Sequence, residues 1–326
     1  RLSLSSNTTA SNNTAVGFSA LTSNTTGTAN NAFGGSALGN NTTGSENVAL
    51  GNNALTTNTI GNYNVAIGIA ALKVATTASN NTSIGYKSLF ANTTGAQNTA
   101  SGQNSLVANT TGSHNVALGR FALAANTTAS NNVAVGSGTM EANTTGTNNT
   151  AVGRLSLYTN TTGSYNTAFG HSALRSTTTG THNTAVGLDA LYNNTTGTRN
   201  VAVGLNALVN STTAADNTAV GYAVMGANST GTSNVAIGAY SLDANTTGSY
   251  NVALGIDALT ANTTANHNVA IGGQAMQDCT TGFDSVGIGW EALEAMTTSS
   301  QNVAVGMNAA KFTTTGSQNA VLGTYA

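Results

Sequence analysis

The chain has 326 residues, of which eight are Lys or Arg and ten are Asp or Glu, and it contains no proline. So few basic residues leave no basic stripe for phosphates, which argues against a nucleic-acid partner. Apolar residues make up 39% of the chain but are mostly small or aliphatic, so any core is thin. No apolar run approaches the roughly eighteen residues of a membrane span, and residues 1–10 lack a signal-peptide pattern, so we expect no membrane insertion.

A glycine recurs every seventeen residues without insertion or deletion, which predicts one continuous repeat array over residues 1–326. Counted from this glycine, the usual unit has Asn at −4, Val or Thr at −3, Ala at −2, an aliphatic residue at −1, Ala or Ser at +3, Leu at +4 and Asn-Thr-Thr-Gly at +7 to +10. Residues 1–4 already match +1 to +4 and the chain stops at +3, so we expect part of a longer protein or of a filament. The repeat glycines are Gly17, Gly34, Gly51, Gly68, Gly85, Gly102, Gly119, Gly136, Gly153, Gly170, Gly187, Gly204, Gly221, Gly238, Gly255, Gly272, Gly289, Gly306 and Gly323.

Within a unit, the large-small-large alternation of residues 235–237 predicts a strand with −3 and −1 on one face and Ala at −2 on the other. Gly238 permits a bend, and Ser241 and Leu242 are expected to begin a second short strand whose Leu returns to the interior. The Asn-Thr-Thr-Gly turn lets Gly at +10 take positive φ, although Ala or Ser at some of these positions argues against a strictly left-handed conformation. The expected fold is all-β: a parallel β-solenoid with one repeat per coil and about nineteen coils.

Stacking of the coils superimposes the Asn residues at −4, and most of those at +7, so their amides can donate and accept along the stack as a ladder. We also expect two apolar stacks at −1 and +4, with local weaknesses where Ser101 and Ala310 interrupt them. The predicted ladder at −4 consists of Asn13, Asn30, Asn47, Asn64, Asn81, Asn98, Asn115, Asn132, Asn149, Asn166, Asn183, Asn200, Asn217, Asn234, Asn251, Asn268, Asn302 and Asn319, with Ser285 in the remaining unit.

A homotrimer is favoured by the alanines. If Ala at −2 and +3 lies outside a core of two or three large side chains per coil, it forms smooth faces that let chains pack closely. The alternative is that these alanines fill space inside a monomeric solenoid.

The few reactive side chains form no pattern of a catalytic or metal site. Residues His114, His182 and His267 share +12 but lie several coils apart, too distant to bind one metal ion. Asp278, Asp284, Glu291 and Glu294 are interpreted as a solvated face rather than a cation site, and Cys279 replaces the Asn at +7 without an intrachain disulfide partner. Nucleophile elbows, phosphate loops and calcium-roll motifs are missing, so we expect a non-enzymatic protein and assign no catalytic residue, metal or cofactor.

Two other surface features leave alternatives open. Tyrosines such as Tyr63, Tyr165 and Tyr250 at +12 are interpreted as single surface or interface residues, with stacking on sugar rings as the alternative. The Thr pair at +8 and +9 could order water on a flat face, as in an ice-binding protein, but neighbouring strand residues point to opposite faces, so only one Thr per coil would be displayed.

The run Asn-Val-Ala-Ile-Gly, as at residues 64–68 and 234–238, resembles the head repeats of trimeric autotransporter adhesins, and the full unit with Asn-Thr-Thr-Gly resembles repeats of phage and bacterial tail-fibre-type proteins. The resemblance extends over the whole chain, although the seventeen-residue unit is longer than that of the adhesin heads. It implies a left-handed β-roll with three chains side by side. It also implies an adhesive or spacer shaft outside the cell or on a virion, with a host-surface glycan or receptor as partner.

From these patterns we expect a non-enzymatic extracellular fibre or adhesin shaft whose variable offsets present surface chemistry. A filament subunit that self-associates head to tail and an ice-binding β-solenoid are the alternatives.

Overall fold

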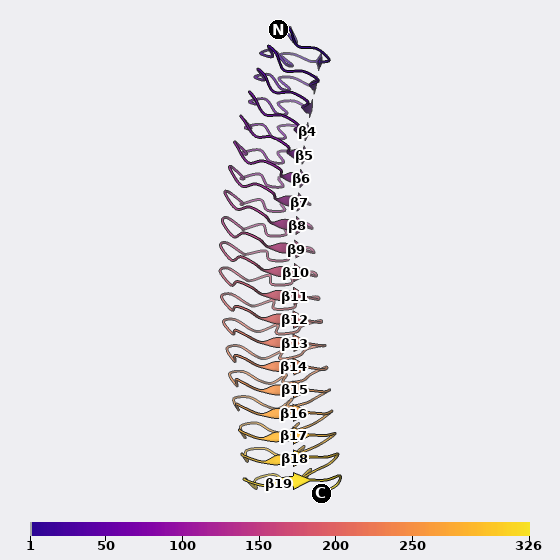
Figure 1. Ribbon diagram of the computed structural model, residues 1–326, viewed down its shortest axis with the longest axis vertical. Helices are drawn as coiled ribbons and strands as arrows, with labels where there is room; N and C mark the ends of the chain where they lie inside the picture. The colour runs from indigo at the N-terminus through magenta and orange to yellow at the C-terminus, as the bar shows by residue number, and fades with distance from the viewer. Residues whose placement is uncertain (1) are drawn as a thin grey trace. The chain divides into compact units, whose positions relative to one another are not determined.

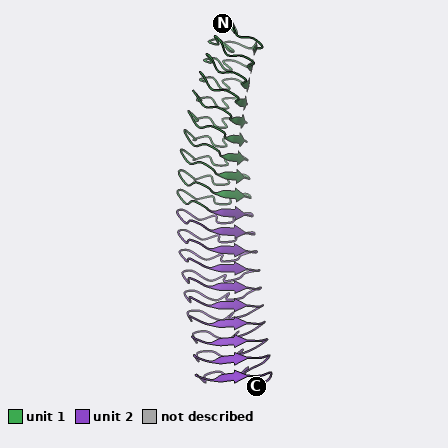
Figure 2. Cartoon of the chain, viewed as in Figure 1, with its two compact units in different colours: residues 1–165 green, residues 166–326 purple. Residues whose placement is uncertain are grey.

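The computed structural model describes residues 2–326, and the chain divides into two compact units, residues 1–165 and 166–326 (Figure 2). Arg1, the first residue of the expected array, lies outside the described residues. In each unit every repeat forms one coil with one three-residue strand (Figure 1), and residues 2–326 form no helix. The all-β parallel solenoid expected from the sequence is confirmed.

Within each unit the strands pair in parallel in sequence order, with every residue opposite the one seventeen positions further on. Unit 1 contains β1 (Thr14–Val16), β2 (Asn31–Phe33), β3 (Val48–Leu50), β4 (Val65–Ile67), β5 (Thr82–Ile84), β6 (Thr99–Ser101), β7 (Val116–Leu118), β8 (Val133–Val135) and β9 (Thr150–Val152). Unit 2 contains β10 (Thr167–Phe169), β11 (Thr184–Val186), β12 (Val201–Val203), β13 (Thr218–Val220), β14 (Val235–Ile237), β15 (Val252–Leu254), β16 (Val269–Ile271), β17 (Val286–Ile288), β18 (Val303–Val305) and β19 (Ala320–Leu322).

The prediction of a second strand at +3 and +4 is wrong, because this part of each coil consists of turns. Tyr240 at +2 and Leu242 at +4 both have left-handed φ angles, 58° and 54°, so the chain curls where a strand would extend. Coil-to-coil hydrogen bonds continue through the turns all the same. The Leu38 amide, for example, donates to the Ala54 carbonyl of the next coil at 3.1 Å.

The predicted orientation of the strand is also wrong. Ala at −2 points inward, as at Ala49 and Ala236, which are fully buried. The aliphatic residue at −1 points outward: Leu50 is 47% exposed and Ile237 is 44% exposed. Ala at +3 and Leu at +4 fill the interior, as at Ala37 and Leu38, which are fully buried. Among residues 2–326 these alanines therefore form no face outside the core, and the alternative in which Ala fills the inside is the one observed.

The narrow interior explains this orientation. The residues at −2 and +3 lie close together, as shown by Ser83, whose hydroxyl donates to the Ser88 carbonyl at 2.8 Å. A Cβ added at Gly287, another −2 position, would come within 2.9 Å of Met276 at +4. Because the +4 side chain reaches the −2 backbone, only small residues fit there, and the larger −3 and −1 residues must face outward.

The two recurrent glycines serve different purposes. At the repeat position the backbone has positive φ, as at Gly51 with 138°, where a Cβ would also meet the next coil's carbonyl oxygen at 2.5 Å. Gly44, at +10, does not have positive φ, but a Cβ there would approach the Gly61 oxygen at 2.4 Å. The expectation that +10 is not strictly left-handed, drawn from Ala and Ser at some of these positions, is therefore confirmed. Ser101 lies on the outer face and is half-buried, so the core weakness expected there does not arise.

Candidate functional site: an asparagine ladder and an exposed sheet face

The Asn residues at −4 form a buried ladder in both units. The Asn47 side chain donates to Asn30 Oδ1 at 3.1 Å, and the Asn47 backbone amide donates to the same oxygen at 3.0 Å. Asn47 Nδ2 also donates to the Gly61 carbonyl at 2.9 Å. The Asn47 side chain thus bonds the equivalent Asn in both adjacent coils, Asn30 and Asn64, and the +10 turn. The predicted amide stacking is observed here, together with backbone bonds that the sequence did not suggest.

A second ladder, at +7, meets the first at one carbonyl group. Asn41 Nδ2 donates to Asn24 Oδ1 and to the Gly44 carbonyl, both at 2.8 Å. The same Gly44 oxygen accepts a second bond from Asn30 Nδ2 at 2.8 Å. Both lone pairs of the +10 oxygen are therefore used, and the Asn-Thr-Thr-Gly turn is held from two sides.

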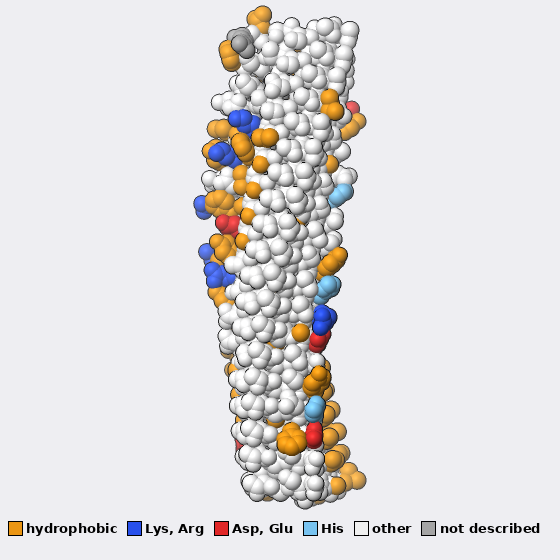
Figure 3. All heavy atoms as spheres, turned by 90° about the vertical axis from the view of Figure 1, so that its left-hand side faces the viewer, with side chains coloured by type: hydrophobic (Ala, Val, Ile, Leu, Met, Phe, Trp, Pro, Cys, Tyr) orange, Lys and Arg blue, Asp and Glu red, His pale blue; other side chains and the backbone are white. Residues whose placement is uncertain are grey.

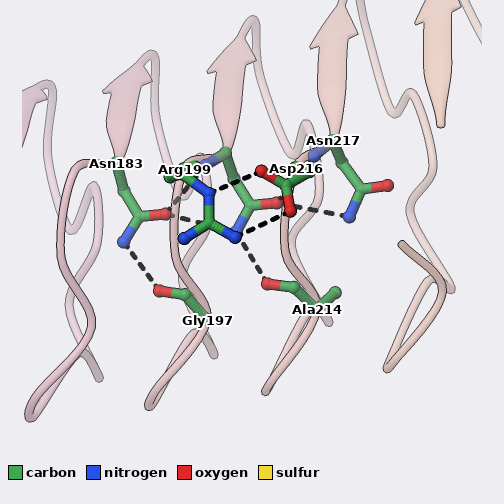
Figure 4. A network of polar contacts seen from close by, with 7 residues as sticks. Asn183, Gly197, Arg199, Ala214, Asp216 and Asn217 are labelled. Atoms are coloured by element: carbon green, nitrogen blue, oxygen red, sulfur yellow. Dashed lines mark hydrogen bonds and ion pairs between the residues drawn. The ribbon is translucent and has the colours of Figure 1, made fainter. Parts of the chain in front are cut away.

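Figure 4 shows the −4 ladder in unit 2 with a surface ion pair beside it. Asn183 Nδ2 donates to the Gly197 carbonyl at 2.8 Å, and the Asn217 amide donates to the Asn200 side chain at 3.1 Å. On the solvent side, Arg199 Nε lies 2.6 Å from Asp216 Oδ1. Hydrogen bonding to Arg199 lowers the pKa of Asp216, so this +12 pair stays ionised at neutral pH.

Where the ladder residues change, the hydrogen bonds are only partly replaced. The Asn302 amide donates to Ser285 Oγ at 3.1 Å in place of an Asn oxygen, and the thiol of Cys279 donates to the Gly282 carbonyl at 3.3 Å. Burial raises the pKa of the Cys279 thiol to about 12, which keeps it protonated and unreactive at neutral pH. Asn262 Oδ1, next to Cys279, and Asn58 Oδ1, next to Ala75, are buried without a hydrogen-bond partner among the described residues.

The outward residues at −3 and −1 form what we call the outer face of the sheet. The −1 residue is Val, Leu, Ile or Phe in eighteen of nineteen units, Ser101 being the exception, and no −3 or −1 residue is charged. None of the −1 side chains is buried. Sequence reasoning missed this face because it placed −1 in the core. The sequence did contain a signal for this face: −1 stays apolar, whereas +1, which is also exposed, includes Gly, Asn, Gln, His and Arg.

The residues at +1, +2, +5 and +6 form a second surface, which we call the turn edge. In unit 1 cations lie over aromatic rings here: Lys87 is 5.3 Å from the Tyr86 ring centre and 5.6 Å from that of Phe90, and Arg120 is 4.5 Å from that of Phe121. Basic and hydrophobic side chains gather along one margin of the molecule in the part that belongs to this unit (Figure 3). A shallow groove of about 440 Å³ lies on this edge, lined by residues that include Val107, Glu141 and Tyr158.

The candidate metal ligands are not brought together. Among residues 2–326 no group of three or more His, Cys, Asp or Glu side chains is placed to hold a metal ion. Of the four acidic residues near the C-terminus, Glu291 and Glu294 bind Lys311, whereas Asp284 contacts His267 at 3.1 Å. His267 also packs against Tyr250 with ring centres 5.4 Å apart, so this +12 tyrosine is in contact with its neighbour rather than isolated.

The Thr pair displays one side chain per coil, as expected. The hydroxyl of Thr42, at +8, donates to the Thr59 carbonyl of the next coil at 2.9 Å, whereas Thr43 at +9 is exposed. The +8 hydroxyl is therefore occupied within the fold, and a single file of free hydroxyl groups remains.

Comparison with known protein families and with curated proteins finds no match to this chain. Nor do residues 2–326 contain a helix of the length and apolar character needed to cross a membrane.

Proposed function

We propose that the protein is a non-enzymatic structural fibre that assembles side by side with further copies of itself through the outer face of its sheet. The observation that carries this proposal is the outward −1 position, which stays aliphatic or aromatic in eighteen of nineteen repeats although the fold leaves it exposed. Because the same offset occurs in nineteen repeats of one chain, the residues that it tolerates can be compared directly. The exposed +1 and +12 positions vary in polarity, so an exposed position that stays apolar along the array indicates a further contact.

A second copy is the partner that fits this face best. The outer face repeats at the strand spacing of about 4.8 Å, and a second copy has the same spacing, so each coil can repeat the contact of the previous one. Apolar side chains from two sheets pack about 10 Å apart in a dry interface. The absence of charge at −3 and −1 removes the usual cost of desolvating ions there.

Three copies per assembly, and a position outside the cell or on a virion, are proposed from the resemblance to adhesin heads and tail-fibre-type repeats. In that setting the variable +1, +2 and +12 residues would present the surface that meets a host glycan or receptor. The ladders support a mechanical role, because every coil adds the same buried hydrogen bonds and stability is a sum over neighbouring repeats.

The test compares two pairs of substitutions that differ only in which surface they change. Leu50→Lys with Ile237→Lys alters the outer face in both units, and the control Ile69→Lys with Ile256→Lys alters equally exposed +1 positions. The exposed fractions are 47% and 44% for the first pair and 56% and 48% for the second. Measured in 0.5 M salt, which screens charge contacts elsewhere on the surface, light scattering should give a multiple of the 32.2 kDa chain mass for the wild type and the control, and the single-chain mass for the outer-face variant.

A monomeric wild type, or an outer-face variant that associates as well as its control, would overturn the proposal. A monomer that also inhibits ice recrystallisation would favour the ice-binding alternative. Filaments of constant width in negative stain that resist the outer-face substitutions would favour head-to-tail polymerisation instead.

A further inference from the structure

Charges on the turn edge are sorted by sign between the two units. Among residues 2–326, the edge of unit 1 carries four basic residues and one acidic residue, whereas that of unit 2 carries two basic and six acidic residues. The basic residues Lys73, Lys87 and Arg120 take part in no ion pair among residues 2–326, although each lies over an aromatic ring. Unit 1 therefore presents positive charge held in place by aromatic rings, and unit 2 presents negative charge at the same offsets.

The two sets of charges also match in position. Lys73 and Asp243 both occupy +5, Lys87 and Asp257 both occupy +2, and the members of each pair are 170 residues, or ten repeats, apart. The same interval joins Glu141 to Lys311 at +5, so the one acidic residue on the unit 1 edge meets a basic one. Arg120, at the same interval, corresponds to the repeat that holds Glu291 and Glu294.

We propose that the turn edge of unit 1 in one copy binds the turn edge of unit 2 in a second copy, with each repeat opposite the repeat ten units further along the chain. This contact would add to the proposed side-by-side assembly. It rests on the proposed function only in requiring a second copy, because the turn edge and the outer face are different surfaces.

No neighbouring register matches the charges as well. A shift of nine repeats places Glu141 opposite Glu291 and Glu294, and a shift of eleven places Arg120 opposite Lys311. With no shift, each charged residue lies opposite the same residue of the second copy, so like charges meet. Like charges held against each other oppose association, whereas complementary charges fix the register and speed the encounter. The ten-repeat register gives four opposite-charge matches and no like-charge match over the repeats from Gly68 to Gly136. Two of these matches involve Glu291, Glu294 and Lys311, which also pair with one another within the chain, so the matches of Lys73 with Asp243 and Lys87 with Asp257 carry the register.

Each edge also carries a groove. In unit 1 the groove is lined by residues that include Phe121 and Glu141, and in unit 2 a groove of about 320 Å³ at the same offsets is lined by residues that include Val209 and Asp243. Small residues contribute to both linings, Ala124 in one and Gly226 in the other. Because any copy carries both edges, the contact is not self-closing, and each copy can bind one neighbour through unit 1 and another through unit 2.

Charge reversal and mixing test the contact on the full chain. Lys73→Asp with Lys87→Asp makes the unit 1 edge acidic, and Asp243→Lys with Asp257→Lys makes the unit 2 edge basic. Lys and Asp both occur naturally at +5, at Lys311 and Asp243, and both occur at +2, at Lys87 and Asp257, so the turns accept these residue types. Each variant alone should lose the edge contact, and a mixture of the two variants should regain it. Glu46→Lys is the control: this residue lies at +12, outside the turn edge, so its substitution should leave the edge contact unchanged.

The readout is a zero-length carbodiimide cross-link between Lys and Asp side chains, identified by mass spectrometry in a mixture of isotopically light and heavy chains. We expect mixed-label links Lys87–Asp257 and Lys73–Asp243 in the wild type, reduced at least tenfold in 0.5 M salt because exposed charge pairs are screened. Absence of these links in an assembly that still depends on Leu50 and Ile237 would overturn the edge contact and leave the outer-face proposal standing. Failure of the mixture to restore them, with heparin binding lost on reversing Lys73 and Lys87, would assign the basic edge to an anionic polysaccharide instead.

Discussion

At the scale of single residues, the asparagine amide is the group that joins the coils. An amide has both donors and an acceptor, so the same side chain can repeat along a stack without an unmatched atom between neighbours. Ser, Thr and Cys replace it locally but leave acceptors such as Asn262 Oδ1 without a partner among residues 2–326. The composition of the ladder therefore limits how much each coil contributes.

Restoring a missing ladder amide should stabilise the protein. Ala75→Asn places an amide next to Asn58 Oδ1, which has no hydrogen-bond partner among residues 2–326, and close to the Ala78 carbonyl. Asn at +7 already coexists with Ala at +10 in the unit containing Asn126 and Ala129, so the site has room. We expect a gain of about 1 kcal/mol in the free energy of unfolding, the net worth of a buried hydrogen bond, measured by urea denaturation.

The matched control removes an amide from an unbroken part of the same ladder. Asn109 donates to Asn92 Oδ1 at 2.8 Å and to the Gly112 carbonyl at 2.9 Å. Asn109→Ala should therefore cost about 1–3 kcal/mol, since it leaves buried polar groups unsatisfied. If Ala75→Asn destabilises the protein as much as Asn109→Ala does, the missing amides do not limit the stability that the ladder contributes.

At the scale of the coil, the sequence determines the period, the strand and the ladder but not which way the strand faces. Val-Ala-Ile alternates equally well with either face inward, because all three residues are apolar. The choice depends on distances across the coil, such as that between Met276 and the backbone of Gly287, which appear only once the turns are built. The second strand was predicted from Ser241 and Leu242, but left-handed φ at Tyr240 and Leu242 replaces it with turns.

The orientation of the strand can be tested on two neighbouring residues of β8. Ala134 is fully buried, and Val135 lies on the outer face and is only half-buried. Ala134→Val adds volume to a filled interior and should cost about 1–3 kcal/mol of unfolding free energy. Val135→Ala should change that free energy by about 0.5 kcal/mol or less, as surface substitutions do. Equal effects of the two substitutions in urea denaturation would mean that the interior is not as narrow as the structure indicates.

At the scale of the whole molecule, the repetition makes the contacts local. Hydrogen bonds between coils join residues about seventeen positions apart, as in the ladder and in the strand pairs of each unit. In such an array stability is approximately the sum of the stabilities of the repeats and of the contacts between neighbours, with no core that depends on distant segments. The outer face and the turn edge follow the same rule, because both present one equivalent position per coil.

Local contacts predict that unit 1 folds without unit 2. A chain of residues 1–165 keeps nine strands, β1 to β9, and all the ladder bonds among their coils. We expect it to unfold cooperatively and to show protected amides at −3, such as that of Val116, in hydrogen exchange. The control fragment carries Gly119→Ala, where φ is 135° and a Cβ would lie 2.4 Å from the Gly136 oxygen, and it should lose protection around β7 and β8 first. A disordered fragment without the substitution would show that folding requires contacts beyond neighbouring coils, against the additive account of the array.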